Sequence, residues 1–228
     1  MSGSFPLVRI AAALDPHGIM LRGVASFDAG EGPSLVDGVS ARSVVLVGNI
    51  GGSIWPHFSR WQQGYDGPDP LDTWSKSLIL PLAQALGATA YFPSDPPYQP
   101  FQQWAVRAED LRPSPLGILL HRRYGLWHGY RGALGFSFEI GSAQVEDEAD
   151  PGQADGWEEA CAAACPAVAV TAEGSDAPRC QRYLSSAAGE ATCMADGCAV
   201  RNCCPVGAEY RYPEDQLRFH MAALTRFS

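Results

Sequence analysis

The alternation of apolar and polar positions along the chain predicts both strands and helices. The uninterrupted apolar run at 43–47 is typical of a strand buried on both faces, and the glycine-rich turn 48–52 follows it. Two further strands are expected at 116–120 and at 133–138, the second with partial alternation. Extended segments separated by tight turns favour a mixed sheet over a regular alternation of strand and helix, so we expect an α+β protein.

Helical spacing is clearest in the middle of the chain and at its end. A helix is expected to begin at Asp69-Pro70 and to end at Gly87, with Pro81 as a kink or a break. Its apolar positions are Leu71, Trp74, Leu78, Leu82 and Leu86. A second helix is expected from Pro213 onward, with the apolar stripe Leu217, Met221 and Leu224.

All seven cysteines fall in the C-terminal third of the chain. They read Cys161-x3-Cys165-Pro166, then Cys180, then Cys193-x4-Cys198-x4-Cys203-Cys204-Pro205. A short helix over 157–165 would place Trp157, Cys161 and Cys165 on one face. Two Cys-Pro endings are typical of iron–sulfur motifs, although no intact C-x2-C-x2-C-x3-C run is present. The spacing therefore indicates thiolate chemistry without specifying the centre.

Three interpretations of the cysteines remain open from the residues alone. A single iron–sulfur cluster of the 4Fe-4S type needs four thiolates, and a zinc site, the weaker alternative, needs four as well. The third interpretation has no metal and leaves the thiols as small buried or redox-active side chains. Disulfides are disfavoured because the number is odd and because no secretory signal precedes the chain, which predicts a reducing, cytoplasmic location.

Net charge excludes some classes of partner. The chain carries −9, and the segment 145–159 alone contains seven acidic residues and no basic one. This segment is expected to be a linker or lid. A protein without a broad basic surface is not expected to bind nucleic acid. No apolar run reaches the length of a membrane span, so no membrane contact is expected.

A polar and aromatic cluster at 121–131 lies between two expected strands. It contains two histidines, three arginines, two tyrosines and a tryptophan. A loop held by a scaffold is a common place for a binding site, and Arg131 would suit a carboxylate or phosphate. The alternative is a solvated hairpin whose aromatic residues cover its own edge.

Three stretches resemble the CblC family of cobalamin-trafficking proteins (methylmalonic aciduria and homocystinuria type C). They are 87–92, 114–121 and Tyr124-Gly125-Leu126-Trp127-His128-Gly129-Tyr130-Arg131-Gly132. Two shorter stretches add to the match. They are Asp69-Pro70-Leu71-Asp72 and the C-terminal Tyr210-x-Tyr212-x2-Asp215-Gln216-x2-Phe219-His220-Met221. Within the family's His-Pro-x-Phe-Gly-Gly-Trp-Phe-x-x-Arg-Gly segment, this chain has Arg122 for proline, Leu126 for the second glycine and His128 for the second phenylalanine. The resemblance covers roughly residues 40–140 and the last 20.

The resemblance implies a flavin-reductase or nitroreductase-like fold with a cobalamin cavity. The family removes the upper ligand of cobalamin by reduced flavin or by glutathione, and some relatives form homodimers. It implies cofactor-binding roles for His121, Trp127, Tyr130, Arg131 and His220, with Arg131 matching an arginine that holds the glutathione carboxylate. For His220, the alternative from the residues is a hydrogen-bonded core histidine.

The cysteine segment resembles epoxyqueuosine reductase, which joins a cobalamin domain to a ferredoxin. Pro178-Arg179-Cys180-Gln181-Arg182-Tyr183-Leu184 carries this likeness. We therefore expect a CblC-like domain at 1–144, a linker or lid at 145–154, a ferredoxin-like segment at 155–210 and a helix at 211–228 that packs on the first domain. The expected function is a corrinoid-handling oxidoreductase with an iron–sulfur cluster as electron relay. The alternatives are a non-catalytic ferredoxin-like carrier, a cobalamin chaperone, or a relic of the fold that binds neither.

Overall fold

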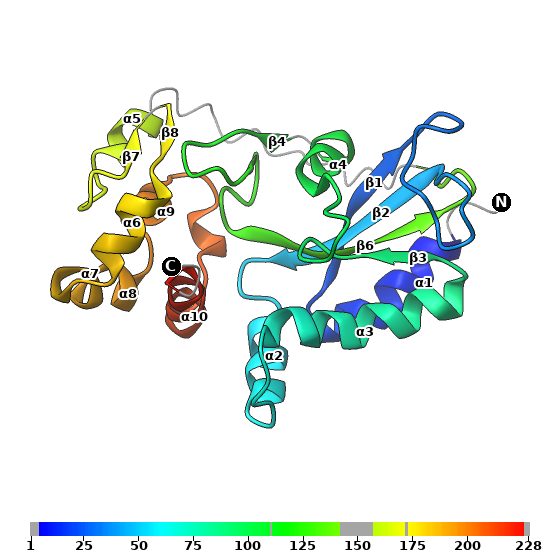
Figure 1. The fold of residues 1–228 in the computed structure, drawn as a ribbon, viewed down its shortest axis with the longest axis horizontal. Helices are drawn as coiled ribbons and strands as arrows, with labels where there is room; N and C mark the ends of the chain where they lie inside the picture. Colours follow the sequence, from blue (N-terminus) through cyan, green and yellow to red (C-terminus); the bar gives the residue numbers. More distant parts are fainter. Residues whose placement is uncertain (1–4, 110, 142–156, 172, 226–228) are drawn as a thin grey trace. The chain divides into compact units, whose positions relative to one another are not determined.

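The chain divides into two compact units, which are described separately (Figure 1). The computed structural model describes residues 5–109, 111–141, 157–171 and 173–225. Unit 1 comprises Met1–Asp110 and His128–Glu146, and unit 2 comprises Leu111–Trp127 and Asp147–Ser228. The expected acidic linker at 145–154 lies outside the described residues.

Unit 1 is built on an antiparallel sheet with the strand order β1-β2-β6-β3. The strands are β1 (Met20–Ser26), β2 (Ser43–Ile50), β3 (Thr89–Tyr91) and β6 (His128–Phe136). The helical segments are α1 (Phe5–Leu14), η1 (Asp15–His17), α2 (Trp55–Gln62), α3 (Pro70–Leu86) and α4 (Phe101–Ala108). In Figure 1, α1 and α3 run along one side of this sheet and α4 lies on the other.

The centre of the unit 1 core is the apolar run that the sequence marks as a buried strand. Side chains from Val44 to Val47 have no exposed surface, as expected for a strand paired on both edges and covered on both faces. Helix α3 ends at Gly87, which adopts the left-handed conformation of a C-terminal cap. The predicted strand at 43–47 and the limits of the predicted helix are confirmed.

Details of two expected elements in unit 1 are wrong. Helix α3 continues through Pro81 without a break, and it buries Ile79 and Ala83 rather than the expected Leu78 and Leu82. Strand β6 begins at His128, whereas the strand expected at 133–138 was predicted to begin only at Ala133. His128 pairs with Ile50, and Tyr130 pairs with Gly48. This pairing explains the early start, because polar residues that look like a loop from their periodicity can join a strand when a neighbouring strand pairs with them.

Unit 2 consists of short elements. Its strands are β4 (Leu111–Arg112), β5 (Leu120–His121), β7 (Val170–Thr171) and β8 (Gly174–Ser175). Its helical segments are α5 (Trp157–Ala162), α6 (Ala177–Leu184), α7 (Ala187–Ala191), α8 (Cys193–Asp196), α9 (Ala199–Cys203), η2 (Ala208–Tyr210) and α10 (Glu214–Leu224). The strand expected at 116–120 is reduced to β5, and the helix expected over 157–165 ends at Ala162.

Close backbone contact fixes the turn that precedes β6 within unit 2. Gly125 has φ of 55°, and a Cβ atom there would lie 1.9 Å from the Val206 carbonyl oxygen. Gly207 has φ of 68°, and its Cβ would lie 2.4 Å from the Tyr124 carbonyl carbon. Both positions require glycine for conformation and for space. Residues 121–127 are therefore held against 206–207, whereas the expected domain boundary at 144 assigns them to the first domain.

The coarse fold class agrees with the sequence. The described residues form a mixed α+β protein with an antiparallel sheet. Helix α10 contacts α8 and contributes Met221 to a cluster with Leu184 and Cys193 inside unit 2. Among the described helices, the length and apolar character needed to cross a membrane are not reached.

Candidate thiolate site

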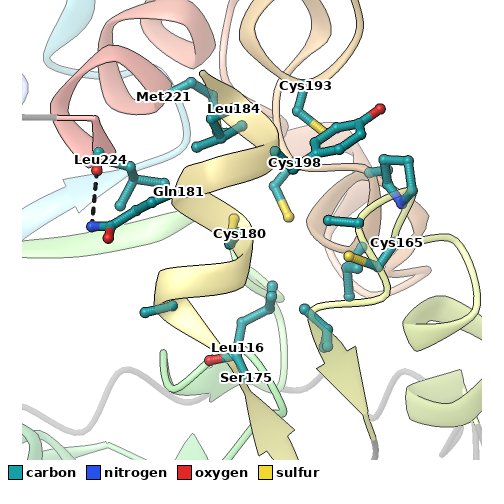
Figure 2. Close-up of a pocket in the computed structure, with 17 residues that line it drawn as sticks. Leu116, Cys165, Ser175, Cys180, Gln181, Leu184, Cys193, Cys198, Met221 and Leu224 are labelled. Carbon is teal, nitrogen blue, oxygen red and sulfur yellow. Dashed lines mark hydrogen bonds between the residues drawn. The ribbon is translucent and has the colours of Figure 1, made fainter. Parts of the chain in front are cut away.

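Four of the seven cysteines line one cavity in unit 2. Cys165 follows α5, Cys180 lies in α6, Cys193 begins α8, and Cys198 is the N-cap residue of α9. Figure 2 shows the sulfur atoms of Cys165, Cys180 and Cys198 directed into the space between α6 and the loop that carries Cys165. Four segments that are separate in the sequence thus contribute one thiol each to a common space.

The cavity has a volume of about 210 Å³, and its remaining wall is mainly apolar. Val170, Leu184, Val200 and Met221 are buried members of this wall. None of the described residues that line it is Asp, Glu, Lys, Arg or His. Ionised thiolates would therefore find no cationic side chain in the wall, and a positively charged soft metal centre would neutralise them.

Local hydrogen bonds fix the segment that carries Cys180. The Asp176 carboxylate accepts the Arg179 N–H at 2.9 Å and caps the N-terminus of α6. In the middle of the helix, the Gln181 side-chain amide donates to the Leu224 carbonyl at 3.2 Å. Helix α6 is thereby tied to α10, and Cys180 sits between these two anchors.

A backbone N–H group is directed at one of the sulfur atoms. The Ala169 N–H donates to Cys165 Sγ at 3.3 Å. Such donors favour the thiolate over the thiol and are typical of cysteines that bind metals.

Burial favours the protonated form of two thiols in the cavity. It raises the pKa of Cys180, and the neighbouring thiols of Cys198, Cys165 and Cys193 raise it further. Burial likewise raises the pKa of Cys198. In the absence of metal these thiols are protonated, and a metal centre that binds here must displace their protons.

The spacing of the cysteines bears on which kind of metal centre the cavity could hold. Within the described part of the chain, no three or more His, Cys, Asp or Glu side chains lie close enough together to share one metal ion. Sulfur atoms bound tetrahedrally to one zinc would lie about 3.8 Å apart, given a Zn–S bond of about 2.3 Å. In an iron–sulfur cluster each cysteine binds a different iron, so the thiolates surround a volume rather than a point.

The other three cysteines do not line the cavity. Cys161 and Cys204 are each 2% exposed and pack with Leu120, Leu126 and other apolar side chains. Cys203 is exposed. All seven cysteines are free thiols, so no disulfide competes with metal binding. The structure thus separates the seven predicted metal ligands into four that share a cavity, two in an apolar cluster and one at the surface.

His121, a predicted cofactor ligand, holds a turn in unit 2. It is 5% exposed, and its Nδ1 accepts the N–H groups of Arg123 at 3.0 Å and of Tyr124 at 3.1 Å. Its ring stacks on Tyr124 with centroids 4.2 Å apart. One imidazole nitrogen is therefore used by the backbone.

Two other predicted cofactor residues, Trp127 and His220, meet at Tyr212. The ring centroids of Trp127 and Tyr212 are 5.5 Å apart, and those of Tyr212 and His220 are 5.4 Å apart. The Arg201 guanidinium lies 4.7 Å from the Trp127 ring and 4.5 Å from the Tyr212 ring. Trp127 is 1% exposed, so it belongs to an aromatic cluster rather than to an open surface.

Tyr130 and Arg131, the remaining predicted cofactor residues, lie on β6 in unit 1. The Tyr130 hydroxyl donates to Glu109, which also accepts two hydrogen bonds from Arg22, at 3.0 and 3.2 Å. Burial raises the pKa of Tyr130 far above its usual range, and the Glu109 carboxylate adds to this effect. Tyr130 is therefore a neutral donor in a buried ionic network. Arg131 is partly buried on the same strand.

The Arg22–Glu109 pair was missed from the sequence. Arg22 is the charged residue within the strand Met20–Ser26, and a lone charge in a strand of this kind is a signal for a buried partner. The partner could not be named, because Glu109 follows α4 and lies 87 positions away in the chain. Its side chain and that of Arg22 are 10% and 0% exposed.

Comparison of the chain with protein-family models, curated proteins and solved structures gives no match. The corrinoid and iron–sulfur roles therefore remain predictions from the sequence. The geometry of the cysteine cavity is the observation from which we propose a function.

Proposed function

We propose that unit 2 holds one four-iron iron–sulfur cluster on Cys165, Cys180, Cys193 and Cys198, and that the protein relays single electrons. The single observation that supports this proposal is the convergence of four thiols from four segments on one cavity with an apolar, uncharged wall. When bound, such a cluster supplies one-electron transfer.

The residues of the chain have distinct tasks in this proposal. The four thiolates hold the irons, and the Ala169 N–H compensates part of the negative charge on the Cys165 sulfur. The apolar wall limits the access of water, which would otherwise hydrolyse the bound cluster. The cap of α6 orients Cys180 before the metal arrives, which reduces the entropy that binding must offset.

Zinc is the competing occupant of the same thiols. Zinc would stabilise the short elements of unit 2 by linking them, and it would have no redox role. We favour the cluster over zinc because four thiols line the cavity and because the two Cys-Pro endings are typical of iron–sulfur motifs. Metal analysis separates the two proposals directly.

For the acceptor of the electrons, we propose a corrinoid held by a CblC-like, nitroreductase-like fold. The support is the sequence resemblance. Glutathione or reduced flavin would then be the alternative reductant, and a homodimer the form suggested by flavin-reductase-like proteins. A ferredoxin-like carrier or a cobalamin chaperone is the alternative if no corrinoid is turned over.

The test is anaerobic reconstitution with iron and sulfide, followed by metal analysis and electron paramagnetic resonance of the reduced protein. The wild type should bind about four iron atoms per chain and show the spectrum of a reduced cluster. Cys180→Ser and Cys198→Ser should lose most of this iron. Cys203→Ser is the matched control, because Cys203 is exposed and lies outside the cavity, and it should retain the wild-type iron content.

Two results would contradict the proposal. One is a wild-type protein that stays free of iron after reconstitution but takes up one zinc ion. The other is loss of iron in Cys203→Ser that equals the loss in Cys180→Ser, since the cavity would then not be the site.

A further inference from the structure

The residue Val168, next to the cavity, has a strained backbone. Its φ is 49°, in the left-handed region that a β-branched side chain strongly disfavours. The side chain is 62% exposed, so burial of the valine does not offset the strain. Conformations of this kind persist where the surrounding structure imposes them, and they cluster at functional sites.

The strained residue lies inside the loop that presents Cys165. The Val168 N–H donates to the Cys165 carbonyl at 3.0 Å, which closes a tight turn. The next amide, that of Ala169, donates to Cys165 Sγ at 3.3 Å. The left-handed conformation at Val168 therefore turns the following peptide back toward the sulfur of the cysteine at the start of the loop.

Two contacts from the α6 segment hold this loop in place. Arg179 Nε donates to the Ala167 carbonyl at 2.7 Å, and the Asp176 N–H donates to the Ala169 carbonyl at 2.7 Å. These bonds flank Val168 on both sides. They also connect the loop of Cys165 to the helix of Cys180, so the strain is supported by the element that carries a second thiol.

We infer that Val168 is a positioning residue, whose left-handed backbone directs the Ala169 N–H at Cys165 Sγ and thereby raises the reduction potential of the centre. The inference rests on the proposed iron–sulfur function. Reduction adds an electron, and therefore negative charge, to a centre held by thiolates. A hydrogen bond to sulfur stabilises that added charge, so its loss shifts the potential to more negative values.

The test compares three variants with wild type after anaerobic reconstitution. Ala169→Pro removes the donor, and Val168→Pro forbids a positive φ while leaving Ala169 in place. Both should keep measurable iron and show a more negative reduction potential in a redox titration followed by electron paramagnetic resonance. Val168→Gly is the matched control, because glycine accepts the left-handed conformation at no steric cost. It should keep the wild-type potential.

Each outcome bears on one of the two proposals. A wild-type potential in both proline variants overturns the inference, as does a negative shift in Val168→Gly. Where circular dichroism shows that the proline variants do not fold, the inference depends on Val168→Gly alone, and a negative shift of its reduction potential overturns it. A wild type without iron overturns the proposed function, and the inference falls with it.

Discussion

Unit 1 and unit 2 are stabilised in different ways. Unit 1 has an antiparallel sheet whose central strand β2 is fully buried, and its helix α3 spans 17 residues. Unit 2 has strands of two residues, and its longest helix, α10, has 11 residues. Within its described residues, the buried apolar side chains are split among three small clusters, of which two contain cysteines.

This difference leads us to expect that only one of the two units depends on a bound metal for its fold. A continuous core such as that around β2 accounts for a stable fold without any ligand. Short elements with small, divided cores are usually held by a metal or by disulfides, and the cysteines of unit 2 are free thiols. We therefore expect the fold of unit 2, and not that of unit 1, to depend on occupation of the cysteine cavity.

The largest effect is expected from iron loading. A centre present at about a thousand times its dissociation constant would stabilise the folded state by about 4 kcal/mol. Hydrogen exchange measured with and without iron should show added protection in α6, α8 and α9, and little change in β1, β2 and β6. Equal protection of both units would break the comparison. Cys203→Ser should behave as wild type in this experiment, and Cys180→Ser should show no added protection.

Removal of a buried charge should destabilise unit 1 strongly. Glu109→Ala leaves the fully buried Arg22 guanidinium without its carboxylate, which costs about 3–5 kcal/mol. The control is Glu139→Ala, because Glu139 is 73% exposed and pairs with Arg42 at the surface, where such pairs contribute about 0–1 kcal/mol. Urea unfolding followed by tryptophan fluorescence measures both. Similar losses in the two variants would show that the Arg22–Glu109 pair has no special role in unit 1.

The two units also differ in how much the sequence could predict. In unit 1, the run 43–47 and the stop at Gly87 are local signals, and the structure agrees with both. The polar start of β6 was missed because its pairing with β2 is a long-range contact. The face of α3 was misplaced by one position for a related reason. Periodicity gives a helix an apolar side, but the neighbouring elements decide which residues of that side are covered.

In unit 2, the sequence predicts thiolate chemistry, but it does not predict how the cysteines are arranged in space. The clustering of the cysteines indicates thiolate chemistry from spacing alone. Cys161 and Cys165 nevertheless look equivalent at one helical turn of separation, whereas α5 ends between them and only Cys165 reaches the cavity. The left-handed Val168 gives no sequence signal at all, since glycine or asparagine is the residue expected there.

A smaller effect is expected from the cap of α6. Asp176→Ala removes the acceptor of the Arg179 N–H and should lower the free energy of unfolding of unit 2 by about 1 kcal/mol. Asp196→Ala is the control, because Asp196 is exposed at the end of α8. Hydrogen exchange of α6 in iron-free protein reports the loss. Unchanged exchange in Asp176→Ala would mean that α6 is not held by its cap.

The smallest and most local effect concerns the alkaline stability of unit 1. Burial raises the pKa of Tyr91 to about 12, and the Tyr91 hydroxyl donates to the Ser34 carbonyl at 2.9 Å. The unfolded chain releases this proton near pH 10, whereas the folded chain retains it. Between about pH 10 and 12 the unfolded state therefore binds fewer protons, and the free energy of unfolding falls as pH rises.

Tyr91→Phe should flatten this fall while costing about 1 kcal/mol at neutral pH through the lost hydrogen bond. Tyr98→Phe is the control, because Tyr98 is 76% exposed, and it should leave the slope unchanged. A residual slope in Tyr91→Phe is expected from Tyr130, whose pKa is also raised. Urea titrations at intervals between pH 9 and 12 measure the slope. If Tyr91→Phe kept the full wild-type slope, the alkaline loss would have to come from Tyr130 and its contact with Glu109 rather than from the sheet edge at β3.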